Sequence, residues 1–151
     1  MSPPIDTPDH AALDAWIDAH FDEEVRFLQA LVQVPTDTPP GNNAPHADRT
    51  AELFASFGFN CEKHPVPADV VAQHGLQSIT NLIVRRPYGA GGKTIALNAH
   101  GDVVPPGLGW SADPYGADVR DGVMYGRGVA VSKSDFATYA FALLALTAGR
   151  H

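Results

Sequence analysis

The sequence predicts a single α/β domain with its helices and strands in layers. Two stretches with apolar residues at helical spacing open the chain, and strand-like apolar runs between glycine and proline residues follow them. A third helical stretch comes last. A length of 151 residues with 44% hydrophobic residues is enough for one domain with a core of its own.

The first helix is expected over residues 9–34, either as one long helix or as two joined near His20. Glu23 and Glu24 lie on the face opposite its apolar residues. The apolar residues at mostly helical spacing are Leu13, Trp16, Ile17, Phe21, Leu28, Leu31 and Val32. Pro35 ends this helix, and the proline, glycine and asparagine residues at 36–43 predict a loop.

A second helix is expected over residues 46–57. Gly58 is suited to the position just past its end, because glycine tolerates a positive φ there. The apolar face of this helix consists of Ala47, Ala51, Phe54 and Ala55.

After the second helix the spacing of apolar residues predicts strands. Cys61 begins one strand, Pro65 and Pro67 mark an irregular path, and residues 81–86 form the next strand. We expect residues 93–100 to form another, buried strand, because a glycine-rich connection of hairpin length joins them to residues 81–86.

The last third of the chain is expected to hold a short β segment over residues 117–125 and then a helix beginning near Ser132. The apolar spacing gives this helix one packed face. That face consists of Phe136, Ala140, Leu143, Leu144 and Thr147.

Charge and composition exclude several classes of protein. The 10 Lys and Arg residues against 17 Asp and Glu give a net charge of −7, and the basic residues are scattered, which argues against nucleic-acid or anionic-membrane partners. The opening residues lack the pattern of a signal peptide, and no apolar run approaches the roughly 18 residues of a membrane span. Cys61 is the only cysteine, so we expect a cytoplasmic protein with no internal disulfide.

His100 and Asp102 form the most informative local pattern. His100 closes an apolar run at the carboxyl end of an expected strand, where open α/β sheets place their ligand sites. Its imidazole is a good zinc ligand, and Asp102 would point to the same side and either bind the metal or orient the histidine. A hydrogen-bonded structural histidine is the alternative interpretation of the pair taken alone.

A series of motifs surrounds this pair in a fixed order. His100-Gly-Asp102-Val-Val-Pro105 is followed by Gly109-Trp110, Asp113-Pro114-Tyr115, Asp121-Gly122 and Tyr125-Gly126-Arg127-Gly128. With the preceding Val34-Pro-Thr-Asp-Thr-Pro-Pro-Gly41, Gly58-Phe59 and Asn81-Leu-Ile-Val, this series resembles a metallopeptidase superfamily over residues 13–145. The superfamily is that of carboxypeptidase G, aminoacylase, acetylornithine deacetylase and succinyl-diaminopimelate desuccinylase.

The resemblance implies a three-layer zinc-exopeptidase-like α/β domain with a mixed β-sheet, present here only in its N-terminal portion. It implies one or two Zn²⁺ ions, replaceable by Co²⁺ or Mn²⁺, which activate a water while a glutamate acts as general base. His100 matches a metal ligand, and Asp102 matches the catalytic-site acid that steers the histidine ring. Trp110, Pro114 and Tyr115 match structural positions.

Two departures from the family pattern stand out. The metal-bridging aspartate of the family corresponds to Val131, which cannot bind a metal, although Lys133 of the same motif is present. Asp135 is a possible substitute ligand, but Ser132-Lys-Ser-Asp135 also fits a capping box at a helix start, which we favour. The last glutamate is Glu62, so the expected general base lies outside this sequence.

The remaining candidates have structural interpretations. His10, His20, His46, His64 and His74 are expected to be surface or structural residues. Arg127 could hold a carboxylate with two hydrogen bonds, or it could satisfy backbone carbonyls, which we favour.

The leading hypothesis is that residues 1–151 are the N-terminal part of the catalytic domain of a zinc-dependent hydrolase of amide or peptide bonds, inactive alone. Its substrate would be a small peptide or an N-acyl amino acid, and the full-length form would be a homodimer. An inserted dimerisation or lid domain and the C-terminal catalytic part would be absent from this chain. The alternative is a non-catalytic, truncated or degenerate family member that keeps only the scaffold.

Overall fold

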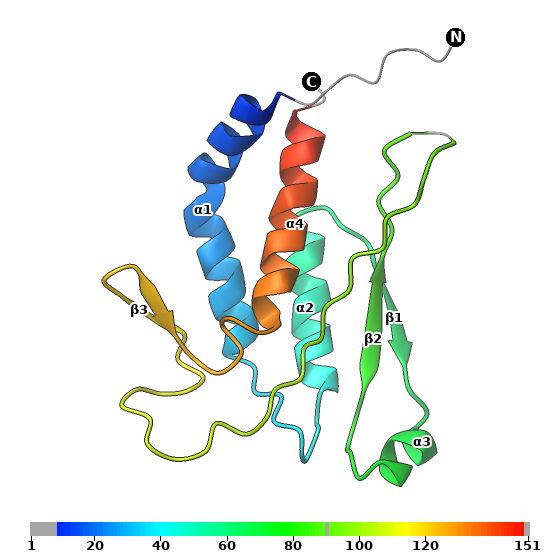
Figure 1. Cartoon of the computed structure of the whole chain (residues 1–151). Coiled ribbons are helices and arrows are strands. Elements are labelled where there is room, and N and C mark those ends of the chain that lie inside the picture. Colours follow the sequence, from blue (N-terminus) through cyan, green and yellow to red (C-terminus); the bar gives the residue numbers. More distant parts are fainter. Residues whose placement is uncertain (1–8, 90, 150–151) are drawn as a thin grey trace.

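The computed structural model describes residues 9–89 and 91–149, and it has the expected mixture of helices and strands. The three long helices are α1 (His10–Val32), α2 (Ala44–Ser56) and α4 (Lys133–Ala148). They lie side by side, with a two-stranded ribbon next to α2 and a short hairpin near the lower end of α1 (Figure 1). The α/β class is therefore confirmed for a partial domain.

Helix α1 is one continuous helix, and the alternative with a break near His20 is not observed. Asp9 caps its start, because the carboxylate accepts hydrogen bonds from the backbone N–H groups of Ala11 and Ala12. Leu31 and Val32 are buried as expected, but Phe21 is exposed. Phe27, which the apolar spacing had not singled out, is buried in the core instead.

The core lies between the three helices. Phe27 of α1 makes edge-on ring contacts with Phe54 of α2 and with Phe141 of α4, at centroid distances of 5.5 and 6.0 Å. The buried members of this core are Phe27, Leu31, Phe54, Phe59, Ala137, Ala140 and Phe141. These contacts fix α4 against α1 and so fix the place where α4 begins, which matters for the site below.

Two of the expected apolar faces are only partly correct. In α2, Ala47, Ala51 and Phe54 are buried, whereas Ala55 is exposed. In α4, Ala140 is the only residue of the expected apolar face that is buried. The other apolar residues of that face are partly buried and pack against the core. The buried row of α4 is Lys133, Ala137, Ala140, Phe141 and Ala145.

The ribbon beside α2 pairs strand β1 (Cys61–Pro65) with strand β2 (Thr80–Val84) in antiparallel register, from Cys61 opposite Val84 to Pro65 opposite Thr80. Both strands were expected, but their connection contains the short helix α3 (Ala68–Gln73), which was not. Cys61 is partly buried, and burial raises the pKa of its thiol, which fits a structural residue.

The expected β segment at 117–125 is a hairpin of two short strands, β3 (Asp118–Arg120) and β4 (Val123–Tyr125). Asp121 and Gly122 form the turn with φ values of 52° and 77°. Two successive positive φ values are typical of a tight two-residue hairpin turn, for which Asp-Gly is a preferred sequence.

The prediction of a buried strand at residues 93–100 is wrong. The segment is irregular, and its Ile95 and Leu97 side chains are 83% and 52% exposed. The expected hairpin with residues 81–86 is wrong too, since β2 pairs with β1. An apolar run becomes a strand only when a neighbouring backbone takes up its N–H and C=O groups. Within the described ranges both sheets are two-stranded and antiparallel, and neither is mixed.

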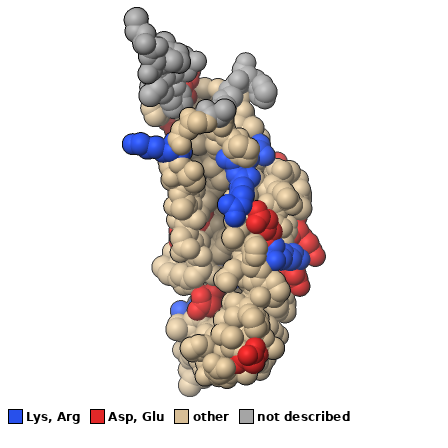
Figure 2. Space-filling view, turned by 90° about the vertical axis from the view of Figure 1, so that its right-hand side faces the viewer, with Lys and Arg blue, Asp and Glu red and all other residues tan. Residues whose placement is uncertain are grey.

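The charged side chains show no concentration of one sign on the face that Figure 2 displays, where lysine, arginine and acidic residues are intermixed. Among the described residues, exposed ion pairs join Lys63 with Asp48 at 2.8 Å and Arg85 with Glu62 at 2.8 Å. Within residues 9–89 and 91–149, none of the helices has the length and apolar character needed to cross a membrane.

Candidate functional site

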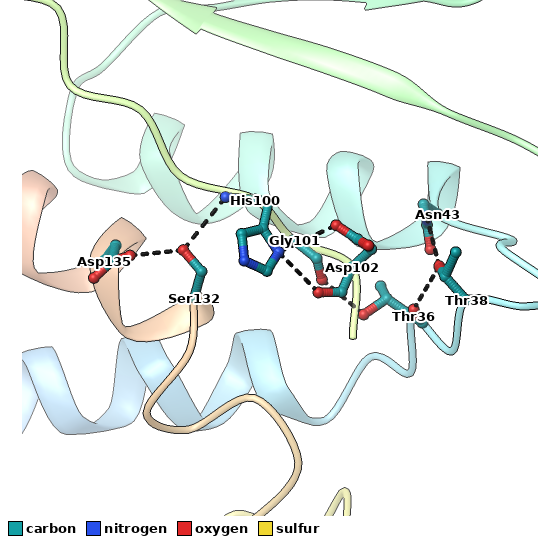
Figure 3. Close-up of polar contacts among 8 residues, drawn as sticks. All are labelled: Thr36, Thr38, Asn43, His100, Gly101, Asp102, Ser132 and Asp135. Carbon is teal, nitrogen blue, oxygen red and sulfur yellow. Dashed lines mark hydrogen bonds and ion pairs between the residues drawn. The ribbon is translucent and has the colours of Figure 1, made fainter. Parts of the chain in front are cut away.

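The His100–Asp102 segment lies between the start of α4 and the loop that follows α1 (Figure 3). Residue 103 fixes its far end, because Val103 N donates to Thr36 O at 3.1 Å and Thr38 N donates to Val103 O at 2.8 Å. The Thr36 hydroxyl also donates to Gly101 O at 2.7 Å. A loop that the sequence shows only as a proline-rich break thus supports the candidate site.

His100 and Asp102 are in contact. His100 Nδ1 lies 3.1 Å from Asp102 Oδ1 and 3.1 Å from the Asp102 backbone oxygen. An Nδ1–H that donates to these oxygens leaves Nε2 as the nitrogen with a free lone pair. Both side chains are about half exposed, so a ligand can approach them.

The pair lines an open pocket of about 230 Å³. The remaining lining residues are Val103, Val104, Arg127 and Val131. Val131 is 66% exposed and presents a hydrocarbon side chain to this pocket. No group of three or more His, Cys, Asp or Glu residues within the described ranges is close enough to hold a metal ion. The residues present therefore fit one corner of a zinc site, with one imidazole donor, and do not fit a complete one.

Asp135 lies in the first turn of α4 and contacts the residue that begins the helix. Ser132 Oγ donates to Asp135 Oδ2 at 2.6 Å, and Asp135 N donates to Ser132 O at 3.0 Å. The reciprocal pattern of a capping box is absent here, since the Ser132 side chain accepts no cap hydrogen bond from the helix. A carboxylate at this end of the helix is still favourable. The expected capping box is therefore wrong, although Asp135 does lie in the first turn of the helix and contacts the residue before it.

The same serine also meets the histidine backbone. His100 N donates to Ser132 Oγ at 3.4 Å, and Ser132 is buried. The start of α4 therefore holds one end of the His100–Asp102 segment, and the loop after α1 holds the other end (Figure 3).

Arg127 uses its guanidinium within the protein. Its Nη2 donates to Pro106 O at 3.1 Å, and its Cζ lies 5.7 Å from the centre of the Trp110 ring. Trp110 Nε1 donates to the same Pro106 oxygen at 2.9 Å. This arrangement agrees with the interpretation that Arg127 satisfies backbone carbonyls, and with a packing role for Trp110.

Tyr115 links two loops around the pocket. Its hydroxyl donates to Asp37 Oδ1, and the preceding Pro114 accepts a hydrogen bond from Arg127 N. Burial, together with the Asp37 carboxylate, raises the pKa of Tyr115, so the phenol stays protonated and remains a donor. Pro114 and Tyr115 thus have the packing roles expected of them.

His46 is a residue whose position the sequence analysis missed. Its ring is buried, and a Cβ added to Gly101 would lie 2.8 Å from ring atoms of His46. Burial, helped by the charge of Lys133, lowers the pKa of His46 to about 3, so the ring is neutral. Sequence periodicity could have found it, because His46, Thr50 and Phe54 follow one another at four-residue intervals on the buried face of α2.

Lys133 is the second such residue. It is fully buried, and its Nζ donates to Val34 O at 2.8 Å and to Leu31 O at 3.2 Å. Burial lowers the pKa of Lys133 to about 8, while the charge of Asp37 acts in the opposite direction. Sequence reasoning noted only that a lysine stands at this position.

Comparison with known proteins assigns the segment that carries the candidate site to a family. Residues 96–150, which contain His100, Asp102 and Val131, match the model of peptidase family M20/M25/M40. The chain belongs to this family. The resemblance stated from the sequence motifs is thereby confirmed. The match includes every residue that lines the candidate pocket.

Similar curated proteins include bacterial succinyl-diaminopimelate desuccinylases. That of Rhodospirillum rubrum is 36% identical over 127 residues, which are 84% of this chain and 30% of that protein. That of Wolinella succinogenes is 45% identical over 119 residues, covering 79% of this chain and 29% of that protein. The M20 chain therefore spans about 30% of the length of the relatives it matches.

Proposed function

We propose that this chain is the N-terminal part of the catalytic domain of a metal-dependent hydrolase that cleaves amide or peptide bonds, with zinc as its metal. His100 would bind the metal through Nε2, and Asp102 would hold the ring through Nδ1. Dipeptides and N-acyl amino acids would be the substrates. The matched relatives, which are named desuccinylases, favour the N-acyl class.

The contact between His100 and Asp102 carries this proposal. A carboxylate on Nδ1 fixes both the tautomer and the direction of the ring, which is how many metal-binding histidines are held. The half-exposed pair lies at an open pocket, so the free Nε2 is accessible. The family match spans this segment and therefore supports the same assignment.

The other metal ligands and the general base would come from further parts of a longer polypeptide, of the length of the matched relatives. In that protein we expect a three-layer domain with a mixed sheet, in which residues 93–100 gain neighbouring strands that cover Ile95 and Leu97. A dimerisation domain, a homodimeric state and a cytoplasmic location belong to the same proposal.

The test compares the 151-residue chain with a polypeptide of the relatives' length that contains it. With Zn²⁺ added, we expect hydrolysis of N-succinyl or N-acetyl amino acids or of dipeptides only by the longer protein. His100→Ala should lower its kcat/KM by at least about 10³. If the short chain hydrolysed a substrate and His100→Ala abolished that activity, the site would not be incomplete. If the longer protein bound metal but had no activity, the proposed reaction would be wrong.

A non-catalytic family member is the second candidate, and Val131 is the observation that favours it. This side chain lines the pocket beside His100 and offers no donor atom. Elemental analysis of the longer protein and its Val131→Asp variant separates the cases. Two zinc equivalents only in the variant would support a lost ligand at position 131. Two equivalents in both would argue for a substitute such as Asp135 and against the non-catalytic candidate.

A further inference from the structure

We propose that Lys133 is a positioning residue for the His100–Asp102 pair, acting through the loop that follows α1. Lys133 does not line the pocket, and its side chain is fully buried. The inference deepens the proposed function, because it rests on His100 and Asp102 as the working residues. It adds a residue on a different element and a physical connection to them.

The first step of the connection joins α4 to the end of α1. The last carbonyl groups of a helix have no partner within the helix, and a positive charge near them is favourable. Helix α1 has no basic residue in its own last turn. Lys133 Nζ supplies both the charge and the hydrogen bonds, at 3.2 Å to Leu31 O and 2.8 Å to Val34 O.

The second step joins this anchored end to the candidate site. Two residues after Val34, Thr36 accepts a hydrogen bond from Val103 N and donates one from its hydroxyl to Gly101 O. Gly101 stands between His100 and Asp102, and the carbonyl that accepts from Thr36 belongs to the peptide group that joins Gly101 to Asp102 (Figure 3). A shift of the loop after α1 would therefore change the direction of both side chains.

The neighbouring residues leave the lysine little freedom. A Cβ on Gly128 would lie 2.9 Å from Val103 Cγ1 and 3.4 Å from Lys133 Cδ, so the stem of Lys133 and residue 103 lie against the same turn. Without the ammonium group, the partly buried Val34 O loses the donor that Lys133 supplies, while Leu31 O keeps the bond from Val34 N at 3.3 Å. Removing one partner of a hydrogen bond in this way costs stability, because the remaining carbonyl is left without its donor. The loop is then expected to move rather than to leave Val34 O without a donor.

The experiment measures local order in the 151-residue chain by NMR, with Lys133→Met as the main variant. We expect the variant to accelerate amide hydrogen exchange at Thr38 and Val103, by a factor at least about ten times larger than the factor for the core amides of α1. The side-chain ¹⁵N spectrum of His100, recorded at one fixed pH, should change from a single Nδ1–H form to a mixture of tautomers. Lys63→Met is the matched control, because it removes an exposed lysine paired with Asp48 and should change neither signal.

Two further variants keep the test decisive. Thr36→Val keeps Lys133 but removes the hydroxyl that holds Gly101 O, so it should alter the His100 spectrum with little change in global stability. Lys133→Gln replaces the ammonium by a neutral amide NH₂, which can still donate hydrogen bonds. It serves if the methionine variant does not fold, and we expect the same changes at a smaller size. Phe141→Leu lowers stability in the core without touching the loop, and it should leave the His100 spectrum unchanged.

The result that overturns the proposal is a uniform one. If the Lys133 variants speed exchange equally at Thr38, Val103 and the core of α1, and the His100 spectrum stays as it is, Lys133 is a stabilising residue only. None of these measurements needs a metal or a substrate. The positioning role and the proposed reaction can therefore fail independently.

Discussion

The helical part of this molecule and the segment at residues 93–116 are both rich in apolar side chains, yet they differ in regular structure and in burial. Helices α1, α2 and α4 bury Phe27, Phe54 and Phe141 against one another. The segment that carries His100 is irregular and leaves Ile95 and Leu97 exposed. The two regions lie next to each other, since the segment passes the start of α4 and the end of α1 (Figure 1).

The difference follows from where each region finds its hydrogen bonds. A helix satisfies its backbone within its own residues, so it needs neighbours only for its apolar face. An extended segment needs another backbone for its N–H and C=O groups. In the described part of the chain, residues 100–103 find such contacts at the loop after α1 and at Ser132. The candidate site is thus the part of the segment that the helical region holds.

The largest expected effect separates the two regions directly. Phe141→Ala should lower the free energy of unfolding by about 3–5 kcal/mol, because it leaves a cavity in the core. Ile95→Ala should change it by less than about 0.5 kcal/mol, because that side chain is exposed. Urea denaturation of both variants tests the contrast. A similar loss in the two variants would mean that the segment is packed in solution, and the contrast would then be wrong.

The next effect concerns pH and His46, which lies where the two regions meet. Its folded pKa of about 3 is below the ordinary value of 6.5, so only the unfolded state takes up a proton between these values. Stability from this group is present above pH 6.5 and is lost as the pH falls toward 3, by up to about 4 kcal/mol.

Urea midpoints between pH 7 and 4 check the role of His46. The His46→Leu variant should lose less stability over this range than the original chain, whereas His64→Gln, at an exposed histidine, should behave like the original. An equal loss in the His46→Leu variant would mean that other groups cause the pH dependence.

The smallest expected effect lies at the contact between the regions. Gly101→Ala places a Cβ about 2.8 Å from the His46 ring and should cost about 1–3 kcal/mol, because the backbone at residue 101 and the buried ring must move apart. Gly92→Ala is the control, since a Cβ there meets nothing within 4 Å. The cost should shrink when Gly101→Ala is combined with His46→Ala. Full additivity of the two changes would show that this contact does not form.

The helices and the His100–Asp102 pair could be predicted from the sequence because their signals are local. Helix α2 ends where Gly58 allows a positive φ, and Ser132 begins α4 as expected. His100 and Asp102 are two residues apart, so their contact needs only a short piece of backbone. The family resemblance rested on the order of motifs around them, and the comparison confirmed the family.

The remaining features depend on residues that are distant in sequence. Lys133 reaches carbonyl groups at 31 and 34, and Thr36 reaches residue 101, so no periodicity within one element reveals either contact. The strand expected at residues 93–100 failed for the same reason, since its formation depends on a partner and not on its own composition.

The sequence by itself determined where the helices run, where turns break them and which two side chains, two residues apart, form the candidate site, because backbone periodicity and residue spacing act over a few residues. The tertiary structure decided what supports that site. The ammonium group of Lys133 from α4, the hydroxyl of Thr36 after α1 and the ring of His46 from α2 reach their partners only when the three helices pack together, since each partner is distant in the sequence.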